Sequence, residues 1–139
     1  MGSTNWLVLL ATVSWGIWAF ALRMAMNTMG PLSVQIVYAI AGVALVPAYW
    51  ALARYWKEPL TYPLAGSAWA TAAAVLVGIG IVALLYAMRS GPSSSAVALT
   101  ATYPAVTLVL AVLFLGESIT LTRVAGVAAI AVGAYLVSR

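Results

Sequence analysis

The chain of 139 residues contains no histidine, no cysteine and only two acidic residues, Glu58 and Glu117. Without histidine and cysteine it cannot form a Ser-His-Asp or Cys-His triad, an ordinary zinc site or a disulfide framework. It also lacks a glycine-rich loop ending in Lys-Ser or Lys-Thr that could hold a nucleotide phosphate. These absences argue against an enzyme, and we expect neither a metal nor another cofactor.

Charge is scarce as well. The chain has 6 Lys or Arg and 2 Asp or Glu, which is 6% of its residues, while 65% are hydrophobic; soluble domains carry about 25% charged residues. A water-soluble fold of this size could not cover its surface with so few charges, so the apolar surface must meet a lipid bilayer. The net charge of +4 comes from cations scattered singly along the chain, which argues against nucleic acid as a partner.

Five apolar stretches are separated by short polar or Pro/Gly-containing joints: 6–26, 32–53, 68–88, 94–115 and 121–137. The first four each reach about 30 Å as helices, the thickness of a bilayer core, and the fifth is shorter. The runs are continuous rather than alternating, and lipid offers the backbone no hydrogen-bond partners, so strands are excluded. We predict an all-α polytopic bundle of five transmembrane helices, forming one domain over residues 1–139.

An odd number of crossings places the two termini on opposite sides of the membrane. The cations then divide three against three: Arg54, Lys57 and Arg123 on one side, and Arg23, Arg89 and Arg139 on the other. Because the side with more Lys and Arg normally stays in the cytoplasm, an equal count favours neither orientation. Either the chain inserts both ways up and pairs as an antiparallel dimer, or the N-terminal amine, loop details or a partner fix one orientation.

Hydroxyl groups surround a proline near the middle of the fourth stretch. Pro104 frees a backbone carbonyl and permits a kink, and Thr100, Thr102 and Tyr103 lie beside it. The threonine hydroxyls can bond back to their own helix, or they can line a cavity and bind a substrate. We take Thr100, Tyr103 and Pro104 as candidate substrate-binding residues.

Aromatic residues supply the other candidates. Trp15 and Trp18 lie three apart near the middle of the first stretch, although tryptophan usually prefers the membrane interface. They either fill the core or line a pocket that stacks an aromatic or cationic ligand, and Tyr38 and Tyr86 are candidates of the same kind. Arg23, near the end of that stretch, can snorkel to the interface, with gating or anion binding as the alternatives.

Two patterns resemble a known family. The run SWGIWAF at 14–20 is followed by Arg23, and YPAV at 103–106 leads to LFLGE at 113–117, with Gly126 and Gly133 beyond it. Together they resemble EamA-type members of the drug/metabolite transporter superfamily, in which the fourth helix carries a central proline and ends in Leu-Gly-Glu. In that family the fifth helix carries spaced glycines.

Most members of this family resemble two such five-helix units joined in one chain, with the second unit inverted relative to the first. The resemblance therefore implies that two copies of this chain combine. The related small multidrug resistance proteins are antiparallel dimers that rely on a first-helix glutamate. Here the corresponding region offers Trp15 and no acid, which argues against drug–proton exchange. We therefore expect a transporter of small metabolites in a prokaryotic plasma (inner) membrane, working by alternating access as an antiparallel homodimer. The alternatives are a half-transporter that needs a different subunit, and a non-transporting membrane scaffold or assembly protein.

Overall fold

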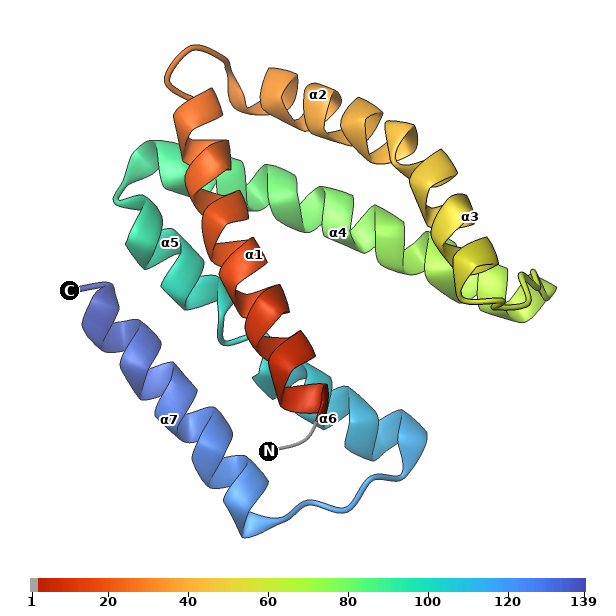
Figure 1. Cartoon of the computed structure of the whole chain (residues 1–139). Coiled ribbons are helices and arrows are strands. Elements are labelled where there is room, and N and C mark those ends of the chain that lie inside the picture. Colours follow the sequence, from red (N-terminus) through yellow and green to blue (C-terminus); the bar gives the residue numbers. More distant parts are fainter. Residues whose placement is uncertain (1–2) are drawn as a thin grey trace.

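The computed structural model describes residues 3–139, which form seven helices and, within that range, no strand. The helices are α1 (Ser3–Ala25), α2 (Pro31–Ala44), α3 (Val46–Tyr55), α4 (Leu64–Ser90), α5 (Ser93–Thr100), α6 (Pro104–Leu115) and α7 (Leu121–Val137). They make five rods, because α2 with α3 and α5 with α6 are each one apolar stretch interrupted by a break (Figure 1). The predicted all-α fold is confirmed.

Four rods are long and apolar enough to cross a membrane: Asn5–Ala25, Pro31–Tyr55, Leu64–Ser90 and Ser93–Leu115. The third begins at Leu64 rather than at the predicted residue 68, because the helix starts directly after the extended Pro63. The fifth rod, α7, has 17 residues and is shorter, as its sequence predicts. Its N-terminus is capped by the Thr120 hydroxyl, which accepts the Arg123 backbone N–H at 3.3 Å.

The helices pack most closely at one end of the molecule. Figure 1 shows α1, α2 and α4 converging there, and α5 follows α4 after a short turn. The buried core at this end consists of Leu22, Val34, Ile81 and Leu85, with Trp18, Ala25, Met26 and Met29 packed against it. The Ser95 hydroxyl donates to the Val137 carbonyl at 3.2 Å, which brings the end of α7 to the start of α5. We call this the closed end; it contains residues 26–30, 91–92 and 138–139.

At the opposite end the rods diverge into two arms. In Figure 1, α3 and the start of α4 point one way, while α6 and the start of α7 point another. No residue of α6 is buried, and Ala53 is the only buried residue of α3. We call this the open end; it contains the joints 56–63 and 116–120. Its apolar side chains, such as Phe114 at 79% exposed, must meet lipid or another protein.

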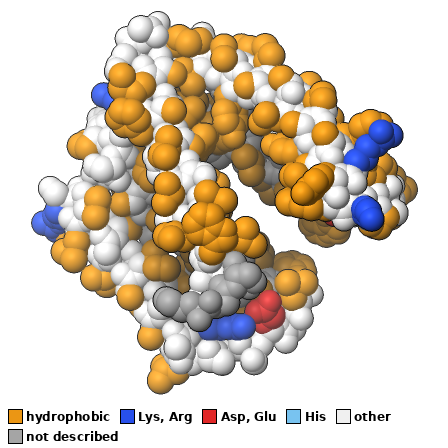
Figure 2. All heavy atoms as spheres, in the orientation of Figure 1, with side chains coloured by type: hydrophobic (Ala, Val, Ile, Leu, Met, Phe, Trp, Pro, Cys, Tyr) orange, Lys and Arg blue, Asp and Glu red, His pale blue; other side chains and the backbone are white. Residues whose placement is uncertain are grey.

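Apolar side chains cover the surface between the two ends. Figure 2 shows them over the rods, with the blue and red charged side chains near the ends and joints. In water such a surface would drive association, whereas in a bilayer it is the expected lipid-facing surface. The structure therefore agrees with the membrane environment that the composition predicts.

Prolines account for both interrupted rods. A proline lacks the N–H of a helical hydrogen bond, and its ring crowds the preceding turn. The second rod breaks at Leu45, two residues before Pro47, and the fourth breaks at residues 101–103, directly before Pro104. In the latter break the Tyr103 N–H bonds to the carbonyl three residues back, at 3.0 Å. At Pro104, where a kink was expected, the helix is interrupted, and the interruption at Pro47 was not predicted.

Candidate functional site

An aromatic pair links α1 to α2 next to the buried core. The rings of Trp18 and Tyr38 meet edge to face, with centroids 6.4 Å apart and an interplanar angle of 60°. Trp18 also packs against the core cluster that contains Leu22 and Val34. Since Trp18 precedes Leu22 by four residues and Tyr38 follows Val34 by four, the pair lies one helical turn from the core toward the open end.

Two buried polar atoms accompany this pair. The Trp18 indole Nε1 and the Gln35 amide Oε1 are both buried without a hydrogen-bond partner. Gln35 lies three residues before Tyr38, so the two share a face of α2. An unpaired buried polar atom costs about 1–3 kcal/mol, and such a cost in a folded protein calls for an explanation. The indole N–H is a donor and the amide oxygen an acceptor, and neither is used within the described part of the chain.

The remaining tryptophan and tyrosine candidates lie outside this contact. Trp15 is on the same face of α1 as Trp18, one turn nearer the open end, and is 63% exposed. Tyr86 is half-exposed and lies roughly opposite the face of α4 that buries Ile81, Leu85 and Met88. The chain therefore brings Trp18 and Tyr38 together, leaves Trp15 open beside them, and turns Tyr86 away from its own core.

Thr100, Tyr103 and Pro104 gather at the break between α5 and α6. The Thr100 hydroxyl donates to the Val97 carbonyl at 2.7 Å, and Thr102 makes the same kind of bond to Leu99. These two hydroxyl protons are thus used within the helix, while each oxygen can still accept a hydrogen bond. The Tyr103 side chain is exposed. Of the candidates at this break, Tyr103 is the freest to donate a hydrogen bond to a ligand.

Sequence reasoning did not assign Gln35 or the contact of Arg23. Gln35 is the only glutamine of the chain, and its position three residues before Tyr38 was the available signal. Arg23 Nη1 donates to the Met88 carbonyl at 2.9 Å, across to the last turns of α4. This hydrogen bond holds the guanidinium between α1 and α4. The expectation that Arg23 snorkels to the interface did not include this contact.

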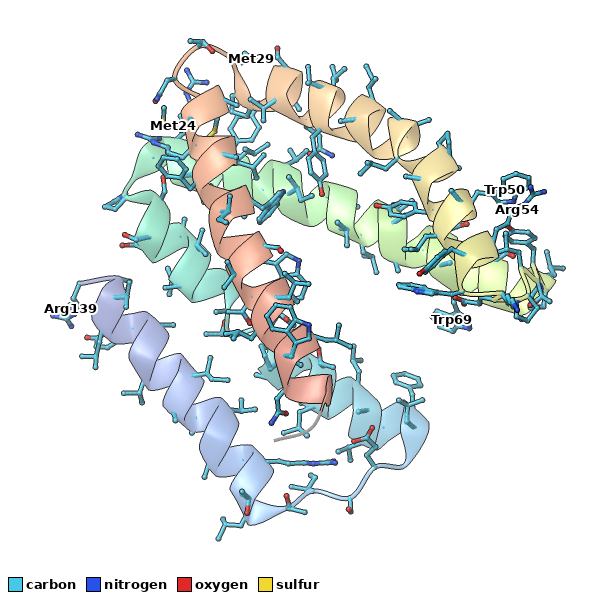
Figure 3. The ribbon with its side chains drawn as sticks, viewed as in Figure 1. Met24, Met29, Trp50, Arg54, Trp69 and Arg139 are labelled. Atoms are coloured by element: carbon cyan, nitrogen blue, oxygen red, sulfur yellow. The ribbon has the colours of Figure 1, made fainter. Side chains whose placement is uncertain are left out.

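The candidate groups are aromatic rings, hydroxyls and one amide. Within the part of the chain that the structure describes, no group of three or more His, Cys, Asp or Glu residues could hold a metal ion. In Figure 3 the labelled Met24, Met29 and Arg139 lie toward the closed end, and Trp50, Arg54 and Trp69 lie toward the open end. The Trp18–Tyr38 pair lies between these two groups along the rods and is the best-formed candidate for a ligand contact.

The chain is similar to a known protein family and to an archaeal protein. The EamA-like transporter family matches residues 2–139 of the chain. An uncharacterized protein of Methanocaldococcus jannaschii is 34% identical over 130 residues, which cover 94% of this chain and 92% of that relative. No solved structure matches the chain. The family match extends over all five rods and both arms.

Proposed function

This chain belongs to the EamA-like transporter family, and from that premise we propose that it moves small metabolites as an antiparallel homodimer by alternating access. The family consists of membrane transporters of small molecules rather than enzymes. Four rods of crossing length make this chain an integral, multi-pass membrane protein. We place it in a prokaryotic plasma membrane, in keeping with its similarity to an archaeal protein.

The divergence of the arms at the open end is the observation that carries this proposal. Within one chain, α1, α2 and α4 share a buried core at the closed end. A second copy, inverted in the membrane, would set its closed end at the other surface. Transporters built from inverted repeats place the substrate between the two halves and open to each side in turn. Two copies of this chain would supply both halves.

The distribution of cations supports insertion in both orientations. Arg23, Arg89 and Arg139 lie toward the closed end, and Arg54, Lys57 and Arg123 toward the open end. This assignment needs α7 to cross the membrane, and the Ser95–Val137 bond supports that by returning the C-terminus to the closed end. Equal numbers of Lys and Arg give the insertion machinery no preference.

The substrate would bind between the arms, beside Trp18, Gln35 and Tyr38 of each copy. Trp15, Tyr86, Thr100, Tyr103 and Pro104 would complete the cavity from the surfaces that a single chain leaves uncovered. Aromatic rings with one free donor and one free acceptor suit a small, partly apolar solute such as an amino acid or an organic cation. The absence of a buried acid leaves proton coupling through a carboxylate without a residue to carry it.

Orientation can be measured directly because the chain has no cysteine of its own. Ser90→Cys reports on the closed end and Ser118→Cys on the open end, and both positions are exposed. In right-side-out membrane vesicles, a membrane-impermeant maleimide should label about half of each variant. Detergent should then expose the remainder, and the cysteine-free parent sets the background.

Complete labelling of one variant and none of the other would mean a single fixed orientation and would overturn the homodimer. That result would direct attention to a different subunit as the partner. Transport itself is tested by reconstituting the purified chain in liposomes and measuring uptake across a panel of amino acids and organic cations. Failure to bind or move any of them would count against a transporter of this substrate class.

A further inference from the structure

A second polar site lies at the closed end, apart from the Trp18–Tyr38 pair. A pocket of about 270 Å³ is lined by Arg23 of α1, Arg89 of α4, Pro31 of α2, and Met26, Thr28, Met29 and Gly30 of the α1–α2 joint. We propose that this pocket binds an oxyanion of the phosphate type, carried either by a lipid headgroup or by a free solute. The inference rests on this chain alone and holds whether or not two copies pair.

The pocket carries positive charge without an internal counter-charge. Glu58 and Glu117 are the only acids of the chain, and both belong to the joints at the open end. The C-termini of α1 and α4 each offset roughly half a charge, and the N-terminus of α2 adds about half a charge back. Two guanidiniums therefore leave a net charge of about +1.5 at the site.

At the open end, by contrast, a cation has a carboxylate partner within the chain. Arg123 forms an ion pair with Glu117 at 2.8 Å, so its charge is met within the chain. Arg23 and Arg89 have no such carboxylate within the described residues. Their charge is therefore available to an anion from outside the chain.

The donors of the pocket are partly arranged in advance. One Arg23 N–H is fixed by the Met88 carbonyl at 2.9 Å, which holds the guanidinium between α1 and α4 and leaves its other N–H groups free. α2 begins at Pro31 with Gly30 as its N-cap and no side-chain cap, so the first-turn amides of α2 lack a side-chain acceptor. A planar guanidinium fork matches two oxygens of a phosphate.

The place of the pocket in the membrane agrees with this ligand. Arg23 lies two residues before the end of α1, and Arg89 lies in the last turn of α4. Both helices have crossing length, so their ends reach the depth at which lipid phosphates and dissolved anions meet the protein. Met26 and Met29 form an apolar part of the pocket wall. They can contact the glycerol and acyl part of a lipid, and they can equally border a free anion.

The test uses the purified full chain, delipidated in a non-ionic detergent without phosphate or sulfonate, at constant ionic strength. Thermal unfolding is followed while two probes are titrated separately: a short-chain phosphatidic acid and inorganic phosphate. At least one probe should stabilise the wild-type chain saturably. Arg89→Gln should weaken the apparent affinity about tenfold or more, the usual effect of losing one charge-assisted hydrogen bond.

Arg54→Gln is the matched control, because it removes the same charge from the open end, where Arg54 stacks 3.9 Å over the Trp50 ring. It should leave both affinities unchanged. Arg23→Lys keeps the charge but loses the fork, and it should weaken binding in a chain that still unfolds cooperatively. Saturation by the lipid alone assigns a headgroup, whereas competition by inorganic phosphate assigns a free oxyanion. No stabilisation by either probe, or equal losses in Arg89→Gln and Arg54→Gln, would overturn the site.

Discussion

Gln35 and Trp18 bury an amide oxygen and an indole N–H where apolar atoms would pack without cost. A chain selected only for stability would place methionine or leucine at position 35. Keeping two unpaired polar atoms beside an aromatic contact is the pattern expected where stability is given up for recognition. At the scale of single residues, we therefore propose this contact as part of the substrate site.

Gln35→Met tests this directly, since methionine has a similar length and no oxygen. Removing the unpaired atom should raise the free energy of unfolding by about 1–3 kcal/mol, and loss of the acceptor should raise the KM for uptake. Denaturant unfolding and liposome uptake measure the two effects. Trp18→Phe is the companion variant, which removes the indole N–H and keeps an aromatic ring against Tyr38. If Gln35→Met instead destabilised the chain, the amide oxygen would have to bond within the protein.

The site was only partly predictable from the sequence. Trp18 and Tyr38 were both candidates, because aromatic residues in the middle of a span are unusual. That their rings meet depends on the crossing of α1 and α2, which spacing along either helix does not encode. Tyr86 was chosen by the same reasoning, yet it lies opposite the buried face of α4. The pocket between Arg23 and Arg89 joins residues 66 positions apart, and no local pattern links them.

At the scale of the elements, apolar length predicted all five rods, because a bilayer requires helices of a set length. The ends of the rods were less predictable, since terminal turns depend on local caps such as Pro63 before α4. Pro104 pointed to a kink in the fourth rod, which the structure has as a break. Pro47 obeys the same rule, but whether a proline bends a helix or divides it depends on what packs beside it.

Gly116 ends α6 in a way that only glycine allows easily. Its φ of +66° lies in the left-handed region, and the following Glu117 N–H closes the helix on the Ala111 carbonyl at 3.2 Å. Gly116→Ala should therefore lower the free energy of unfolding by about 1–2 kcal/mol, as measured by denaturant unfolding. Gly30→Ala is the control, because Gly30 has an ordinary φ of −74° and open space around its Cα. It should be neutral or slightly stabilising, and equal losses in the two variants would contradict the argument.

At the scale of the whole molecule, the proposed dimer depends on a balance of three cations against three. A small change in charge should then change orientation measurably. Lys57 is a suitable position, because it is exposed in the joint after α3 and has a φ of +56°. Asparagine tolerates that conformation better than most residues.

Lys57→Asn leaves three cations at the closed end and two at the open end. Because the more cationic end is retained in the cytoplasm, most copies should then insert with the closed end inside. Maleimide labelling of Ser118→Cys in right-side-out vesicles should rise from about half toward completion. Glu58→Gln changes the neighbouring charge without changing the count of Lys and Arg, so it should leave labelling near half. An unmoved ratio in Lys57→Asn would show that something other than this balance sets orientation.

The unequal lengths of the rods have a consequence for the surrounding lipid. At about 1.5 Å per residue, the 27 residues of α4 extend about 40 Å and the 17 residues of α7 about 26 Å. The longer rod must tilt to fit a hydrocarbon layer of about 30 Å. If α7 also crosses, as the proposed dimer requires, the layer beside it must thin by about 4 Å. Acyl chains next to α7 would then be compressed, and shorter chains would relieve the mismatch. The chain should therefore favour thin bilayers. The length of the lipid tails should then influence the relative position of the two arms.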